Sequence, residues 1–236
     1  MRDNNLIRLN KYISNSGVCN RRQADKLILS GMIKVNGVKA TQMGMKIRLD
    51  DIVEFNNKVI SNQEKIYLLW NKPKKIAVDI KEIENYNFAP FEKQKETTIL
   101  PIYKIDKNDS GVILFTNDKE IINKMSCNEK IKKIFHVNLN KKVNLMQINS
   151  LKKDISSTEK NIIVDDISHV NHGGEDEIGI SLRSNNKYNL KDILRNLGFA
   201  VKYIDLVFYA GFTKKDVPRK QYRSLTDNEI NLLKRL

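Results

Sequence analysis

The segment LPIYKIDKNDSGVILFTND, residues 100–118, contains the clearest change of pattern in this chain of 236 residues. Residues 100–105 are apolar apart from Lys104, and residues 112–115 are wholly apolar, so both segments are typical of buried strands. Residues 107–111 between them are dense in turn formers. Asp106 therefore lies where a strand gives way to a loop. A carboxylate at such a junction is ordinarily a turn or cap residue, and a functional role is the alternative.

The segments around this unit predict two modules. Residues 66–70 favour a buried strand that ends at the Asn-Lys-Pro sequence of residues 71–73, because proline disfavours continued pairing. Residues 55–65 are polar and turn-rich, which is typical of a short connection. We expect one module at 1–60, a linker at 61–65 and a second module at 66–236. Residues 79–98 have no clean periodicity, and we assign them no chemistry.

The first module is predicted to be two helices followed by a hairpin. Apolar residues at helical spacing stop at Gly17, which suits the left-handed conformation after a helix end. Asn20 and Gln23 form a capping-box pattern for a second helix, which ends before Gly31. The Asn36-Gly37 pair between alternating residues is the strongest short-range hairpin signal.

The charge of the chain favours a polyanionic partner. It carries 42 basic and 28 acidic residues, a net charge of +14. Arg21, Arg22 and Lys26 crowd the start of the second predicted helix, where the helix dipole disfavours cations. A bound phosphate would compensate for this, and a solvated charged face is the alternative.

The composition excludes several classes of protein. Apolar residues make up 40% of the chain and charged residues 30%, so it should fold around a real core. No apolar run approaches the roughly 18 to 20 residues of a bilayer crossing, and two cysteines cannot form a disulfide framework. Met1 to Asn10 lack the apolar region of a secretory signal. We expect a cytoplasmic protein without a membrane partner.

Residues 7–55 resemble an S4 RNA-binding domain. The resemblance is carried by RLNKYI at 8–13, SGVCNRRQAD at 16–25 and VNG at 35–37. It implies that six basic side chains face RNA phosphates: Arg8, Lys11, Arg21, Arg22, Lys26 and Lys34.

The second module resembles the ribosomal RNA pseudouridine synthases that carry an amino-terminal S4 domain. The matching segments are NKP at 71–73, IDKNDSGVILFTND at 105–118, KIFHV at 133–137 and residues 186–198; YAGFTKKDVPR at 209–219 and YRSLT at 222–226 resemble the Bacteroidetes branch. This family resemblance implies an α+β protein, in which a small S4 domain precedes a catalytic domain with a mixed, largely antiparallel sheet. It also implies ribosomal RNA as the partner.

The same resemblance assigns the candidate catalytic residues. Asp106 matches the nucleophile of the family's Arg-Leu-Asp motif, and Lys104 stands at the arginine of that motif. Phe135 stands at the tyrosine of the Lys-x-Tyr-x-Val strand and keeps an aromatic face without the hydroxyl. Lys191 remains as the cation of the third motif. The isomerisation needs neither redox chemistry nor a metal, and the sequence has no phosphate-loop or zinc motif, so we expect no cofactor and a monomeric enzyme.

The departures from the family motifs leave a second hypothesis open, a non-catalytic RNA-binding or ribosome-assembly factor. Asp109 replaces a common threonine and brings a second carboxylate near Asp106. An open basic cleft with Asp106 within reach of Lys191 and Phe135 indicates the enzyme. A filled cleft, or an Asp109 salt bridge that occupies the cation, indicates the binder.

Three further patterns have mainly structural interpretations. His169 and His172 fit a polar hairpin loop better than a metal site. Cys127 fits a buried thiol better than a thiol–imidazole pair with His136. Lys132 and Lys133 are expected either to contact phosphate or to solvate a strand end.

Overall fold

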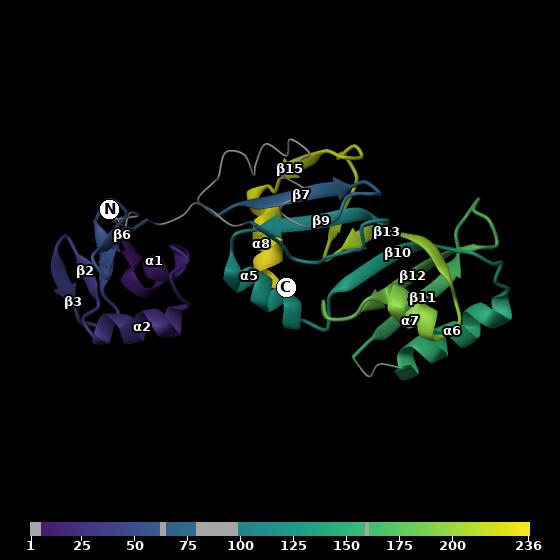
Figure 1. Ribbon diagram of the computed structural model, residues 1–236, viewed down its shortest axis with the longest axis horizontal. Coiled ribbons are helices and arrows are strands. Elements are labelled where there is room, and N and C mark those ends of the chain that lie inside the picture. The colour runs from purple at the N-terminus through teal and green to yellow at the C-terminus, as the bar shows by residue number, and fades with distance from the viewer. Residues whose placement is uncertain (1–5, 62–64, 79–98, 159–160) are drawn as a thin grey trace. The chain divides into compact units, whose positions relative to one another are not determined.

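The structure of the chain is a computed structural model that describes residues 6–61, 65–78, 99–158 and 161–236 (Figure 1). It divides into two compact units, Met1–Lys65 and Ile66–Leu236, which are described separately below. Residues 62–64 of the expected linker, and residues 79–98, lie outside the described ranges.

The first unit packs two helices against short strands. Its elements are β1 (Leu6–Arg8), α1 (Leu9–Asn15), α2 (Arg21–Leu29), β2 (Ile33–Val35), β3 (Val38–Ala40), β4 (Lys46–Arg48), β5 (Val53–Phe55) and β6 (Lys58–Ile60). Strands β3, β2, β5 and β6 form one antiparallel sheet in that order, and β1 pairs with β4. The apolar faces of both helices and of the sheet form one core.

The local signals of the first unit are confirmed. Asn20 and Gln23 form the reciprocal capping box of α2, with backbone-to-side-chain distances of 2.9 and 3.1 Å. Gly17 and Gly31 follow the two helices with φ of 83° and 70°, and Asn36-Gly37 turns between β2 and β3 with φ of 50° and 80°. Short-range chemistry therefore marks these boundaries, and the Asn36 side chain also bonds to Asp51 and Ile52, each at 2.9 Å.

The second unit is built on one large mixed sheet. Its elements are β7 (Tyr67–Lys72), β8 (Leu100–Pro101), β9 (Ser110–Thr116), α5 (Lys119–Cys127), β10 (Lys132–Leu139), α6 (Leu145–Thr158), β11 (Ile163–His169), β12 (Glu177–Arg183), α7 (Leu190–Asn196), β13 (Val201–Tyr209), β14 (Phe212–Thr213), β15 (Tyr222–Ser224) and α8 (Asp227–Arg235). The main strand order is β11-β12-β10-β13-β9-β7-β15. Only β9 and β13 pair in parallel among the described strands, so the expected mixed, largely antiparallel sheet is confirmed.

The helices divide between the two halves of this sheet (Figure 1). Helices α6 and α7 lie against the half that contains β10 to β13, and α5 lies beside β9. Figure 1 shows α8 near α5 on the same half. None of the helices in the described ranges has the length and apolar character needed to span a bilayer.

The central strands β7 and β9 are buried on both faces. Leu69 and Leu114 face the main core, whereas Trp70, Ile113 and Phe115 face a second cluster on the other side. The Trp70 and Phe115 rings are 6.0 Å apart in that cluster. Burial on both faces explains why these strands are continuous apolar runs rather than alternating ones.

The predicted strand at 100–105 is mostly wrong, since only Leu100–Pro101 pair with β9. Ile102 still donates a backbone hydrogen bond to the Leu114 carbonyl at 2.8 Å, and the backbone leaves the sheet after it. It bends so that the carbonyls of Asp106 and Lys107 turn towards the buried ammonium of Lys72. The second predicted strand begins earlier than expected, at Ser110. An interaction with a residue far away in sequence overrides the local pattern here.

Gly111 is required where β9 passes β13. It has a φ of +135°, and a Cβ atom there would lie 2.4 Å from the Leu206 carbonyl oxygen. We expect Gly111→Ala to lower the free energy of unfolding by roughly 3 kcal/mol or more, because both the backbone angle and the overlap are unfavourable. Gly179→Ala in β12 is the control, since its Cβ would meet nothing closer than 3.8 Å. Equal urea midpoints for the two variants would contradict this account.

Candidate functional site

Asp106 lies on an exposed loop between β8 and β9. Its side chain is 49% exposed. Its carbonyl accepts a hydrogen bond from the Asp109 backbone N–H at 3.1 Å, so the loop closes as a tight turn. The carboxylate itself is left facing solvent rather than capping the turn.

Lys72 holds this loop from the end of β7. It is fully buried, and its Nζ donates to the carbonyls of Asp106 at 3.0 Å and Lys107 at 3.1 Å, and also to those of Pro73 and Asp109. Sequence reasoning used this lysine only as part of a motif and gave it no role. A lysine that continues a buried strand is the signal that points to an interior partner.

Lys191 joins two carboxylates. Its Nζ lies 3.0 and 3.2 Å from the Asp109 carboxylate oxygens and 3.6 Å from Asp106 Oδ2. The Asp109 side chain is 4% exposed and also accepts from the Ile204 backbone N–H at 2.9 Å. The Asn189 side chain caps α7 by accepting a hydrogen bond from the Lys191 backbone N–H. This cap fixes the position of the Lys191 backbone in the first turn of the helix. Lys191 is thus shared between Asp109 and Asp106, with the shorter distances to Asp109.

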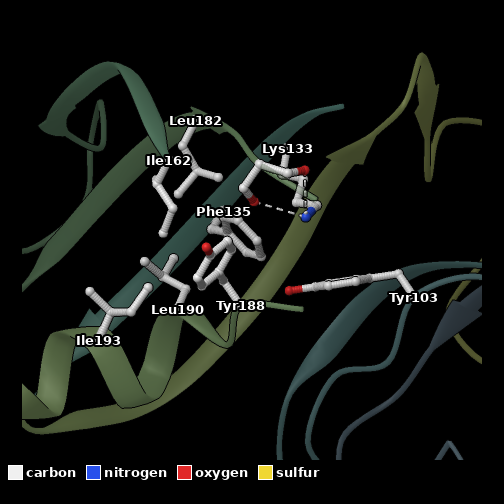
Figure 2. A pocket seen from close by; sticks show the side chains of 9 residues that line it. Tyr103, Lys133, Phe135, Ile162, Leu182, Tyr188, Leu190 and Ile193 are labelled. Carbon is white, nitrogen blue, oxygen red and sulfur yellow. Dashed lines mark hydrogen bonds between the residues drawn. The ribbon is translucent and has the colours of Figure 1, made fainter. Parts of the chain in front are cut away.

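Phe135 and Lys104 have different surroundings. Phe135 on β10 is 2% exposed and lines a cavity with Tyr103, Lys133, Tyr188 and Leu190 among others (Figure 2). The cavity volume is about 10 Å³, which is room for about one water molecule. Lys104 is exposed and has no hydrogen bond or ion pair to any described residue. The structure therefore brings Lys191 to Asp106, places Phe135 in an inner wall, and leaves Lys104 in solvent.

Tyr103 and Lys133, which sequence reasoning did not assign to the catalytic site, also line this cavity. Tyr103 is 7% exposed and stacks on Tyr209, with ring centroids 5.5 Å apart. Burial raises the pKa of Tyr103, and the negative charges of Asp106 and Asp109 raise this pKa further. The Lys133 Nζ lies 4.6 Å from the Tyr103 ring centroid.

Lys133 corrects one expectation from the sequence. It neither solvates a strand end nor reaches the surface, because it is 1% exposed and donates to three oxygens of Ser184 and Asn185. Burial lowers the pKa of Lys133 to about 7. Lys133 lies two residues before Phe135 on β10, and residues two apart on a strand share a face. This spacing is the sequence signal for the burial of Lys133.

A second cluster, formed around Asp205, fixes the end of the Asp106 loop at Ser110. Asp205 on β13 accepts from Ser110 Oγ at 3.0 Å and pairs with Lys214 and Arg219. Arg219 also donates to the Asn71 side chain at 2.9 Å. Burial raises the pKa of Asp205, but the bonds and charges of Lys214 and Arg219 outweigh it and hold this pKa below the usual value. The sequence signal for this cluster is a lone carboxylate, Asp205, within the otherwise apolar stretch 203–209, because a buried carboxylate needs charged partners.

The six basic residues assigned to RNA in the first unit lie beside its two helices or in its sheet. Arg8, Lys11, Arg21, Arg22 and Lys26 are exposed on or beside α1 and α2. Lys34 differs from them. It alternates with the core residues Ile33 and Val35 and donates to the Asn57 side chain at 2.9 Å, so it lies on the sheet face away from the helices.

The secondary candidates carry no separate site. No group of metal-ligating side chains occurs among the described residues, and His169 ends β11 at its hairpin with β12. The expected burial of Cys127 is wrong, because its side chain is exposed at the end of α5. His136 contacts Glu177 at 2.7 Å rather than a thiol.

Comparisons with known proteins match both units. The S4 domain family matches residues 7–53, and the RNA pseudouridylate synthase family matches residues 66–194. The dual-specificity RNA pseudouridine synthase RluF of Escherichia coli K12 is 26% identical over 232 residues, covering 95% of this chain and 77% of RluF. The ribosomal large subunit pseudouridine synthase B of Bacillus subtilis 168 is 35% identical over 119 residues, covering 50% of this chain and 49% of that protein.

The fold agrees with these matches. A crystal structure of a pseudouridylate synthase aligns with a TM-score of 0.59 at 19% identity, covering 96% of this chain and 99% of the other. The matches to these two families define an isomerase that acts on RNA. The chain belongs to the RNA pseudouridylate synthase family.

Proposed function

We propose that this enzyme converts a uridine of ribosomal RNA into pseudouridine, with Asp106 as the nucleophile. The observation that carries the assignment is the half-exposed Asp106 carboxylate 3.6 Å from the ammonium of Lys191. The choice of ribosomal RNA is supported by the S4 module and by the name of the Bacillus subtilis relative.

The reaction requires an attacking group but no net oxidation. An Asp106 oxygen bonds to C1′ of the ribose, and the N1–C1′ bond breaks with its electron pair on the uracil. The uracil turns, C5 bonds to C1′, and the Asp106 oxygen leaves. C5 then loses its proton and N1 gains one, so product and substrate are isomers.

The neighbours of Asp106 suit this role. Lys191 orients the carboxylate and places a positive charge beside it. Lys72 and the Asp205 cluster fix the loop backbone, so Asp106 is held in place before RNA arrives. The cavity at Phe135 has room for only about one water molecule, so the uracil stands on the open side at Asp106 and meets this cavity at its edge. Lys104, exposed two residues before Asp106, is placed to meet a phosphate.

The target uridine must leave its stack to reach Asp106. This costs a few kcal/mol, and less in loops than in a duplex. Phosphate binding by the S4 module offsets that cost. Arg21 and Arg22 are the best placed, because they are exposed at the start of α2, where the helix dipole also favours an anion.

Charge removal at this helix start is expected to weaken RNA binding. In an Arg21→Ala/Arg22→Ala variant, the slope of log K against log salt should fall by about 1 for each phosphate that the variant no longer binds. Lys58→Ala, which removes an exposed charge from β6, is the control and should leave the slope nearly unchanged. Filter binding to ribosomal RNA fragments at several salt concentrations measures both. An unchanged slope in the double variant would mean that these arginines bind no phosphate.

One observation favours a second candidate, the non-catalytic RNA-binding factor. Lys191 lies closer to Asp109 than to Asp106, so its ammonium is paired mainly with Asp109 and less with the candidate nucleophile. Pseudouridine mapping of ribosomal RNA with and without the enzyme distinguishes the two. A uridine that is modified only in its presence supports the synthase, and unaltered maps with intact binding support the factor.

We propose further that the enzyme works as a monomer in the cytoplasm and needs no bound cofactor. One chain contributes the nucleophile, its cation and the RNA-binding module, and the isomerisation itself transfers no electrons. Ribosomal RNA is its expected partner.

A further inference from the structure

The cavity lined by Phe135 has a hydroxyl on its opposite wall, that of Tyr103, which precedes Asp106 by three residues in the chain. Figure 2 shows the Tyr103 side chain entering from the loop side, with its oxygen directed towards Phe135 and Tyr188. Tyr103 and Phe135 line the same cavity. Phe135 offers the cavity only a ring, whereas Tyr103 offers a ring and a hydrogen-bond donor.

The Tyr103 hydroxyl is an unused donor within the described part of the chain. The residue is more than nine-tenths buried, yet none of the described residues hydrogen-bonds to it. The stacked neighbour Tyr209 differs, because its hydroxyl is bound to the Asn186 side chain at 2.9 and 3.2 Å. The Tyr103 hydroxyl oxygen is not among the fully buried polar atoms that lack a partner, so it keeps some contact with solvent. A donor that is held in a fixed ring, reaches solvent and is used by no described residue is available to a ligand group.

The surroundings of Tyr103 keep it neutral and rigid. The nearby Asp106 and Asp109 charges and its burial raise its pKa, so it keeps its proton at neutral pH. Stacking on Tyr209 at an interplanar angle of 13° fixes the ring, and Lys133 covers it from 4.6 Å. A fixed neutral phenol is a good donor and a poor base.

We propose that the Tyr103 hydroxyl donates a hydrogen bond to a carbonyl oxygen of the target uracil. The proposal rests on the function proposed above and adds a residue that contacts the substrate. When the N1–C1′ bond breaks, the electron pair stays on the uracil and its charge spreads to O2 and O4. A preorganised donor at one of these oxygens stabilises the developing anion more than the neutral base. Tyr103 thereby supplies the hydroxyl donor in this cavity that the Phe135 side chain does not have.

The test combines Tyr103→Phe with sulfur substitution in the RNA. The substrate is a ribosomal RNA fragment with uridine, 2-thiouridine or 4-thiouridine at the position that the wild-type enzyme modifies. Single-turnover rates should fall about 10- to 100-fold in Tyr103→Phe on uridine, with RNA affinity unchanged. One of the two thio-substituted RNAs should slow the wild-type enzyme but not slow Tyr103→Phe further, because sulfur is a weak acceptor and the variant has no donor to lose.

The control variant is Tyr67→Phe, which removes a buried hydroxyl that donates to Asp118 in the same unit. It should lose stability without a change in the single-turnover rate. A Tyr103→Phe rate within twofold of wild type overturns the proposal, as does equal slowing of both enzymes by both thio-substituted RNAs. Failure of the proposed function is distinct from these outcomes, since the wild-type enzyme would then form no pseudouridine on any RNA.

Discussion

Replacement of Asp106 by asparagine abolishes pseudouridine formation, and we expect the rate to fall by a factor of at least about 10³. The amide has the shape of the carboxylate but cannot form the bond to C1′. The Asp106 side chain is half exposed and caps no turn, so the fold and the RNA affinity should be retained. Tritium release from C5-labelled RNA and mass spectrometry of the product measure the loss.

A matched carboxylate provides the control for this variant. Asp192→Asn removes a negative charge from α7, next to Lys191, where Asp192 pairs with Arg195 in solvent at 57% exposure. Its rate should equal that of the wild-type enzyme, because an exposed pair contributes little to stability. Undiminished product from Asp106→Asn would end the assignment of the nucleophile.

Replacement of Lys191 by methionine is expected to lower both stability and activity. The Asp109 carboxylate is 4% exposed, and among the described residues it would keep only the Ile204 backbone N–H as a partner. Removing one member of a buried ion pair costs about 3–5 kcal/mol in the free energy of unfolding, since the other charge stays buried. Activity should also fall, because Asp106 loses the cation 3.6 Å away. Urea denaturation and single-turnover assays measure the two effects.

A double variant separates the two roles of Lys191. In Lys191→Met/Asp109→Asn, no buried charge is left behind, so most of the lost stability should return. The activity should not return, because the cation beside Asp106 is still missing. If stability and activity recover together, Lys191 acts only by holding Asp109 in place.

The elements set by local chemistry could be predicted from the sequence. The capping box of α2 joins residues three apart, and the Asn36-Gly37 turn is marked by two adjacent residues that accept positive φ. The apolar runs at 66–70 and 112–115 are buried strands because both faces of the sheet are covered. The family itself was recognisable, since its motifs are short and occur in a fixed order.

The interior interactions of the site could not be predicted in the same way. The segment after Ile102 leaves the sheet because Lys72, 34 and 35 residues away from Asp106 and Lys107 in the chain, binds the carbonyls of both. Lys133 was placed at the surface by its charge, yet it lies inside where Ser184 and Asn185 supply acceptors. In both cases the chain folds around a buried ammonium that local sequence patterns assign to solvent.

The sequence by itself determined the order of the modules, the two helices and hairpin of the first module, the buried strands at 66–70 and 112–115, and the turn-rich loop after Asp106, because these follow from short-range spacing and side-chain type. Only the tertiary structure decided that Lys191 is shared by two carboxylates and that Tyr103 shares a cavity with Phe135. The physical reason is that hydrogen bonds and ion pairs act over a few ångströms of space. Residues 109 and 191, or 103 and 135, come that close only when the sheet has formed.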